Sequence, residues 1–133
     1  MKSLIVSCLA AMTLAKEIKY APAATVCVAN NGGYMLEWWY RDTMQGTTGR
    51  HSRGFSRGNN ECMDINTAGS GYYNTFEIWS HATAGHTVDA DYQIIWDPNG
   101  GTAGFECFGS TMSIHCELQG ISMPIPDEAE GTS

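Results

Sequence analysis

The C-terminal part of the chain contains two stretches in which apolar and polar residues alternate with a period of two, a pattern typical of a β-hairpin. Gly109-Ser110 separates the two arms and provides a turn. The apolar side of the hairpin consists of Ala103, Phe105 and Cys107 on the first arm and Ile114, Cys116 and Leu118 on the second. Both cysteines lie on the apolar faces, where a disulfide between neighbouring strands or between sheets fits.

The same alternation recurs along the preceding chain and is interrupted by glycine- and asparagine-rich turns. In the aromatic stretch 34–41, we assign one face to the core, namely Tyr34, Leu36, Trp38 and Tyr40. Further strands are predicted over residues 25–29, 50–58, 61–65, 75–81 and 91–96, and the clearest turn over 97–101. About eight strands without helical periodicity predict an all-β fold, an antiparallel β-sandwich, with a small β-barrel as the second interpretation.

Residues 1–23 have the features of a secretory signal peptide. Lys2 gives a positive start, residues 4–15 are apolar, and small residues ending at Ala15 and Ala23 provide two cleavage sites. A retained N-terminal helix is the alternative interpretation. We expect a β-sandwich domain over residues 24–121 and an acidic, flexible tail over residues 122–133.

Four of the five cysteines remain once the signal peptide is removed, an even number typical of an oxidised secreted domain. Among the three pairings that four cysteines allow, Cys27 with Cys62 and Cys107 with Cys116 is the simplest. A regular pleat places the apolar neighbours of Cys62 inward and Cys62 outward. A bond from Cys62 across the core would therefore need a bulge or a shifted register.

The chain carries a formal net charge of −7 at pH 7. Cleavage after Ala23 would remove three lysines and one glutamate, which leaves four basic and thirteen acidic residues and no lysine. Because phosphate contacts need distributed positive charge, this balance argues against nucleic acid as a partner. Three of the four arginines, Arg50, Arg53 and Arg57, lie in a predicted strand so poor in apolar residues that it belongs at a sheet edge. They would protect that edge or bind a carboxylate or sulfate of a partner.

Motifs for catalysis or metal binding are few. The histidines have no metal-ligand spacing, no CxxC pair is present, and Asp89, Asp91 and Asp97 match no known calcium loop. We therefore predict no catalytic residues, no metal site and no cofactor. A ribonuclease-like hydrolase is the alternative, since small acidic secreted ribonucleases combine glutamate, arginine and histidine side chains. The chain offers Glu37, Arg41, Arg50, Arg53, His51, His81 and His115 for this role.

Aromatic residues outside the predicted core indicate a binding surface. Trp39 and Trp79 point to the outer faces of their strands, and exposed tryptophans commonly contact sugars, lipids or protein partners. For Trp39, packing beneath a neighbouring loop is the other interpretation.

Two short segments are similar to a pattern found in a known family. They are Asn31-Gly32-Gly33-Tyr34-Met35-Leu36 and Phe108-Gly109-Ser110-Thr111-Met112. They resemble Ser-Gly-Ala-Tyr-Val-Ala and Trp-Gly-Thr-Thr-Leu in the C-terminal β-sandwich domain of the thiol-activated, cholesterol-dependent cytolysins and of small secreted proteins that share this domain. The family's Thr-Leu pair recognises sterol at the domain tip, so the resemblance implies a contact surface at Ser110, Thr111 and Met112. Met112 stands where the family has leucine, and the family's tryptophan-rich undecapeptide has no counterpart after Ile65.

Together these features predict a secreted, non-catalytic binding module that recognises a protein, glycan or lipid surface, peripheral membrane contact included. The predicted contact residues are Trp39, Arg50, Arg53, Arg57, Trp79, Ser110, Thr111 and Met112. The ribonuclease-like hydrolase and a structural subunit of an extracellular or lumenal assembly are the alternatives.

Overall fold

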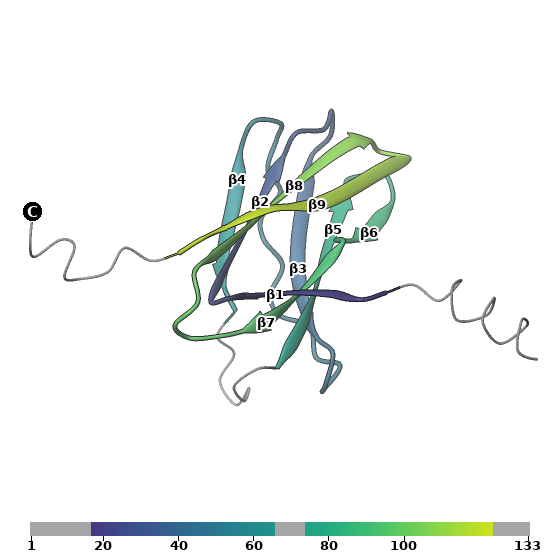
Figure 1. The fold of residues 1–133 in the computed structure, drawn as a ribbon. Coiled ribbons are helices and arrows are strands. Elements are labelled where there is room, and N and C mark those ends of the chain that lie inside the picture. The colour runs from purple at the N-terminus through teal and green to yellow at the C-terminus, as the bar shows by residue number, and fades with distance from the viewer. Residues whose placement is uncertain (1–16, 66–73, 124–133) are drawn as a thin grey trace, which may run out of the picture.

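The computed structural model describes residues 17–65 and 74–123, which form nine strands in two sheets (Figure 1). The strands are β1 (Lys19–Ala23), β2 (Thr25–Asn30), β3 (Leu36–Asp42), β4 (Asn60–Asp64), β5 (Thr75–Ala82), β6 (Thr87–Asp89), β7 (Tyr92–Trp96), β8 (Thr102–Ser110) and β9 (Ser113–Ser122). The predicted all-β sandwich is confirmed, and within these ranges the strands form two separate sheets, not a closed barrel. The described part of the chain contains no helix long and apolar enough to cross a bilayer.

The first sheet has the order β1-β7-β5-β3, with β6 also paired to β5, and the second has the order β4-β2-β8-β9. Most pairs are antiparallel, as predicted, but β1 pairs with β7 and β2 with β8 in parallel. The cause is the bend at Ala24, where the chain passes from the first sheet into the second. The turn at residues 97–101 takes β7 into β8 in the same way, so the two crossing segments run alongside each other.

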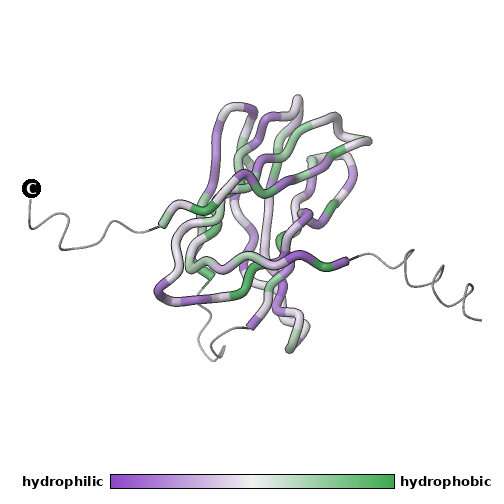
Figure 2. The backbone as a smooth tube through the Cα atoms, in the orientation of Figure 1, coloured by the Kyte–Doolittle hydropathy of each residue, from purple (hydrophilic) through white to green (hydrophobic). Residues whose placement is uncertain are grey.

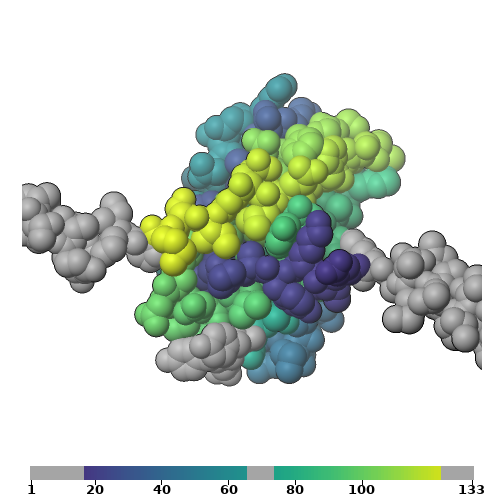
Figure 3. Space-filling view, in the orientation of Figure 1, coloured from purple at the N-terminus to yellow at the C-terminus, as the bar shows by residue number. Residues whose placement is uncertain are grey.

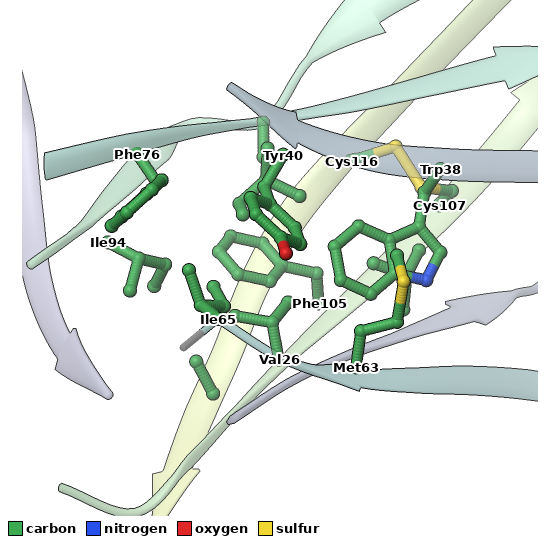
Figure 4. Close-up of a cluster of buried hydrophobic side chains, with 14 of the residues drawn as sticks. Val26, Trp38, Tyr40, Met63, Ile65, Phe76, Ile94, Phe105, Cys107 and Cys116 are labelled. Atoms are coloured by element: carbon green, nitrogen blue, oxygen red, sulfur yellow. A yellow bond between two sulfur atoms is a disulfide. The ribbon is translucent and has the colours of Figure 1, made fainter. Parts of the chain in front are cut away.

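The core lies between the two sheets and contains the inward residues of nearly every strand (Figure 4). Trp38, Phe76 and Phe105 are its largest fully buried side chains. Along the strands, hydrophobic and hydrophilic residues alternate (Figure 2), so each strand presents one apolar side to the core. The predicted core residues of the stretch 34–41 are all buried.

The arginine-rich stretch 50–58 is not the predicted edge strand. It is an irregular segment that runs along β3, held by hydrogen bonds from Gly49 N to Tyr40 O (2.8 Å) and from Ser52 N to Trp38 O (2.8 Å). Phe55, its one large apolar residue, is buried and exchanges two backbone hydrogen bonds with Leu36. Too few apolar side chains alternate here for a regular strand, yet the segment still covers the edge of β3.

The predicted C-terminal hairpin is present as β8 and β9, but its turn lies at Thr111 and Met112 instead of Gly109-Ser110. Gly109 stands within β8 at a φ of 100°, and a Cβ at this position would collide with the carbonyl oxygen of Ser113. This local geometry requires glycine and lets the ladder continue as far as Ser110.

Both predicted disulfides are present, and each joins residues directly opposite each other in neighbouring antiparallel strands. Cys107–Cys116 is buried within the sandwich. Cys27–Cys62 lies on the outer face of the second sheet, with Cys62 exposed. Because this bond joins two strands of one sheet and does not cross the core, the anticipated bulge or shifted register at Cys62 is not needed. Two disulfides are consistent with an oxidising or extracellular location.

The first sheet begins inside the stretch predicted as signal peptide. β1 occupies residues 19–23, with Ala21 and Ala23 buried, so the sandwich starts before the predicted boundary at residue 24. Cleavage after Ala15 would keep β1, whereas cleavage after Ala23 would remove it. Residues 1–16 and 124–133, which contain the rest of the predicted signal peptide and nearly all of the predicted tail, lie outside the described residues.

Two tyrosines predict a loss of stability at alkaline pH. Burial raises the pKa of Tyr34 and of Tyr40 above 10.0, although Arg50 acts on Tyr40 in the opposite direction. The unfolded chain therefore ionises these phenols first, so their contribution is complete below pH 10.0 and is lost as the pH rises through the raised pKa. We expect the melting temperature, measured after brief equilibration, to fall above this pH. In a Tyr34→Phe/Tyr40→Phe variant the decline should be shallower, and an equal decline would contradict this assignment.

Candidate ligand-binding face

Six residues on the outer face of the first sheet form the candidate site, which we call the tryptophan face: Glu37, Trp39, Arg41, Glu77, Trp79 and His81. They alternate with core residues along the adjacent strands β3 and β5, so the pleat that buries Trp38 turns Trp39 outward. The antiparallel register places Trp39 opposite Trp79, Glu37 opposite His81 and Arg41 opposite Glu77. The face therefore has an aromatic centre with an acidic and a basic residue at each end.

Glu77 fixes one end of the tryptophan face. One of its carboxylate oxygens, Oε1, accepts hydrogen bonds from Arg41 Nη1 (3.0 Å) and from the indole Nε1 of Trp79 (3.1 Å). The Glu77 side chain is only 21 % exposed, so this contact is partly shielded from water. The orientation of the Trp79 ring is thereby set before any ligand arrives.

His51 covers part of the aromatic centre. Its imidazole stacks on Trp39 with ring centroids 4.2 Å apart and planes tilted by 5°. Its Nδ1 lies 3.3 Å from Glu37 Oε1. Both interpretations of Trp39 thus hold in part: the 50–58 segment half-covers this ring, while Trp39 and Trp79 remain partly exposed.

The opposite end of the face is also ordered by hydrogen bonds. Nδ1 of His81 lies 2.9 Å from the hydroxyl of Thr87 in the neighbouring strand β6.

Beside Glu77, a hollow of about 210 Å³ is lined by residues of β5, β6, β7 and the N-terminal segment, among them Lys19, Asp89, Asp91 and Gln93. A partly exposed aromatic pair surrounded by fixed donors and acceptors suits a flat ligand that carries several hydroxyl groups. Within the described ranges, no group of three or more acidic, histidine or cysteine side chains is arranged to hold a metal ion.

The three predicted arginines have different recorded neighbours. Arg53 is 82 % exposed and pairs with Glu61 at 3.3 Å, Arg50 acts electrostatically on Tyr40, and Arg57 precedes the turn at Gly58. Arg53 also lines a hollow of about 370 Å³ between residues 53–56 and the start of β4. Arg53 therefore has an ion-pair partner in Glu61, and anion binding by the three arginines stays a prediction.

The predicted contact residues Ser110, Thr111 and Met112 lie at one end of the sandwich, where β8 turns into β9. His86 N donates to Thr111 O (2.8 Å), which ties this turn to the β5–β6 turn. Met112 is 64 % exposed. The turn is therefore exposed at Met112 and is held against the β5–β6 turn, and its residues are not among the six that define the tryptophan face.

Sequence reasoning did not identify Glu37, Arg41, Glu77 and His81 as a group with the two tryptophans. The sequence does contain a signal for this group. An acid, a tryptophan and a base stand at alternate positions in two stretches, Glu37-Trp38-Trp39-Tyr40-Arg41 and Glu77-Ile78-Trp79-Ser80-His81. Antiparallel pairing of two such stretches places acid opposite base and tryptophan opposite tryptophan. The stacked His51 has no such signal, since the 50–58 segment is irregular.

Comparison with solved structures finds similarity to cholesterol-dependent cytolysins, as the two sequence segments suggested. Pneumolysin matches over 74 % of this chain at 9 % sequence identity with a TM-score of 0.43. A disulfide-locked mutant of intermedilysin, solved with human CD59, matches over 74 % at 12 % identity with a TM-score of 0.32. The resemblance is weak, and the chain spans about a quarter of the length of these structures (23 % and 24 %). No protein-family model and no curated protein sequence matches the chain.

Proposed function

We propose that the protein is a secreted, non-catalytic module that binds glycans on the tryptophan face. The observation that carries this proposal is the cross-strand pair of Trp39 and Trp79, partly exposed at the centre of one sheet face. An indole ring packs against the apolar side of a sugar ring while charged groups around it exchange hydrogen bonds with hydroxyl groups. Glu37 and His81 at one end and Arg41 and Glu77 at the other provide those groups on both sides of the pair.

The test is a glycan array followed by calorimetric titration of the best binders. Replacement of Trp79 by alanine should weaken binding about tenfold or more, because the stacking surface is lost, and Trp39→Ala should act in the same direction. Phe108→Ala is the matched control. Phe108 lies on the second sheet, where it contacts His115 edge-on with centroids 3.9 Å apart, so its removal should leave glycan affinity unchanged. An array without binders, or binding that survives both tryptophan replacements, would overturn the proposal.

Lipid and protein surfaces are tested in parallel. Co-sedimentation with vesicles that is lost in Met112→Ala and kept in Trp79→Ala would move the binding surface to the β8–β9 turn. A further result would be recovery of the protein from its native source without reductant, together with a stoichiometric protein partner. If the protein also binds neither glycans nor vesicles, this result would favour the structural-subunit alternative. The mass of the recovered chain would also test secretion, which requires loss of the N-terminal stretch.

A hydrolase is the second candidate function, because Glu37 and His51 lie within 3.3 Å of each other and His81 is the register partner of Glu37. A carboxylate and two imidazoles on one face are the groups that acid–base cleavage of RNA uses. Degradation of RNA by the purified protein that is abolished by Glu37→Gln would replace the binding proposal with this one. We expect no cleavage above that of the Glu37→Gln variant.

A further inference from the structure

The strands at the ends of the two sheet orders are β1, β3, β4 and β9, and β6 forms a further short edge beside β5. Three of the four terminal edges are protected within the described residues. The 48–55 stretch covers β3 with backbone hydrogen bonds. On the near side of the molecule, where β9 crosses above β1 (Figure 3), Asp91 covers part of β9: its N donates to Cys116 O (3.3 Å) and its Oδ1 accepts from Leu118 N (2.8 Å). β1 carries Lys19 and Pro22, and a proline cannot donate to an added strand.

Within the described residues, no segment covers the edge of β4, and the basic side chain that contacts this strand is that of Arg53, which pairs with Glu61. In Figure 1 β4 is the outermost strand of its sheet, and its five residues include no lysine, arginine or proline. Two hydrogen bonds, from Ile65 N to Ala24 O (3.0 Å) and from Asn30 N to Asn59 O (2.9 Å), show which residue pairs of the β2–β4 ladder are hydrogen-bonded to each other. In this pattern Glu61 and Met63 bond to β2, while the backbone N–H and C=O groups of Asn60, Cys62 and Asp64 point away from it. Within the described residues, these outward groups have no backbone partner.

We propose that β4 pairs with β4 of a second copy of this chain, so that two four-stranded sheets join into one. An antiparallel pair centred on Cys62 aligns its outward groups with those of the second copy and forms six backbone hydrogen bonds across a twofold axis. In this register Asn60 lies opposite Asp64 of the other copy, twice by symmetry, and Glu61 lies opposite Met63. No like charges meet across the new ladder.

The side chains at the edge fit this arrangement. Asn60, Cys62 and Asp64 all lie on the exposed face of the sheet. Asp64 Oδ1 accepts a hydrogen bond from Thr25 Oγ1 (2.7 Å), which leaves Oδ2 for the amide of Asn60 in the second copy. The hollow of about 370 Å³ beside Asn60 and Glu61 leaves space along the inner side of the edge.

Sedimentation velocity of the oxidised protein over micromolar to millimolar concentrations tests the proposal. The wild-type chain should form a reversible dimer. Asn60→Asp places two carboxylates opposite each other at both symmetry-related positions and should weaken dimerisation about tenfold, whereas Asn60→Lys should strengthen it. Gln119→Glu is the control. It adds the same negative charge on β9, at the opposite end of the sheet from β4, and should leave the dimer unchanged.

Three results would overturn the proposal: a wild-type protein that stays monomeric at the highest concentration, a dimer insensitive to both Asn60 replacements, or a dimer that Gln119→Glu weakens as much as Asn60→Asp. Circular dichroism and melting temperature identify folded variants. The Asn60 side chain points to solvent, so both replacements should keep the fold.

Discussion

Replacement of Trp38 by alanine should lower the free energy of unfolding by about 3–5 kcal/mol, which is comparable to the whole stability of many small domains. The side chain is 0 % exposed, and its indole Nε1 donates a hydrogen bond to Glu61 O at 2.9 Å. The substitution would leave a large cavity between the sheets and remove a hydrogen bond that connects β3 with β4. We expect the variant to be largely unfolded at physiological temperature.

Urea unfolding followed by circular dichroism measures this effect, and the neighbouring tryptophan provides the matched control. Trp39→Ala removes the same side chain from the same strand but from its outer face, where the ring is partly exposed. Its cost should stay near 1 kcal/mol or below, mostly from the lost stacking with His51. Similar losses for the two variants would mean that the assignment of inner and outer faces of β3 is wrong.

Mild reduction should open one disulfide and lower the free energy of unfolding by about 4 kcal/mol in the chain-entropy model. Cys62 is exposed on the outer face, whereas Cys107 and Cys116 are buried at 0 % and 4 % exposure. A thiol reductant therefore reaches Cys27–Cys62 first, because exchange requires access to a sulfur. This bond spans 35 residues, against 9 for Cys107–Cys116, so its loss frees the larger loop in the unfolded chain.

Alkylation and peptide mass mapping at increasing reductant concentration identify the bond that opens, and urea unfolding gives the stability of each species. A Cys27→Ala/Cys62→Ala variant should match the mildly reduced protein in stability. Earlier or simultaneous opening of Cys107–Cys116 would contradict the predicted order.

The parts of the fold that follow from local alternation could be predicted. Leu36, Trp38 and Tyr40 face the core because the side-chain period of a strand is two. The disulfide pairing that is present is the simplest of the three that four cysteines allow. β1 and β6 could not be predicted, since the composition of β1 matches a signal peptide and β6 has three residues. The parallel pairings, and the position of Trp39 opposite Trp79, depend on strand order, which the local pattern does not contain.

The parallel pairings of β1 and β2 also determine when the domain can fold. Lys19 pairs with Tyr92 and Thr25 with Thr102, so the two strands nearest the N-terminus receive these partners only after most of the chain has been made. Contacts between residues so distant in sequence make folding slow, because the loop between them must close before the pairing stabilises it. Neither half of the chain contains a complete sheet. The N-terminal half is therefore expected to remain without its complete sheets until the C-terminal half has been made.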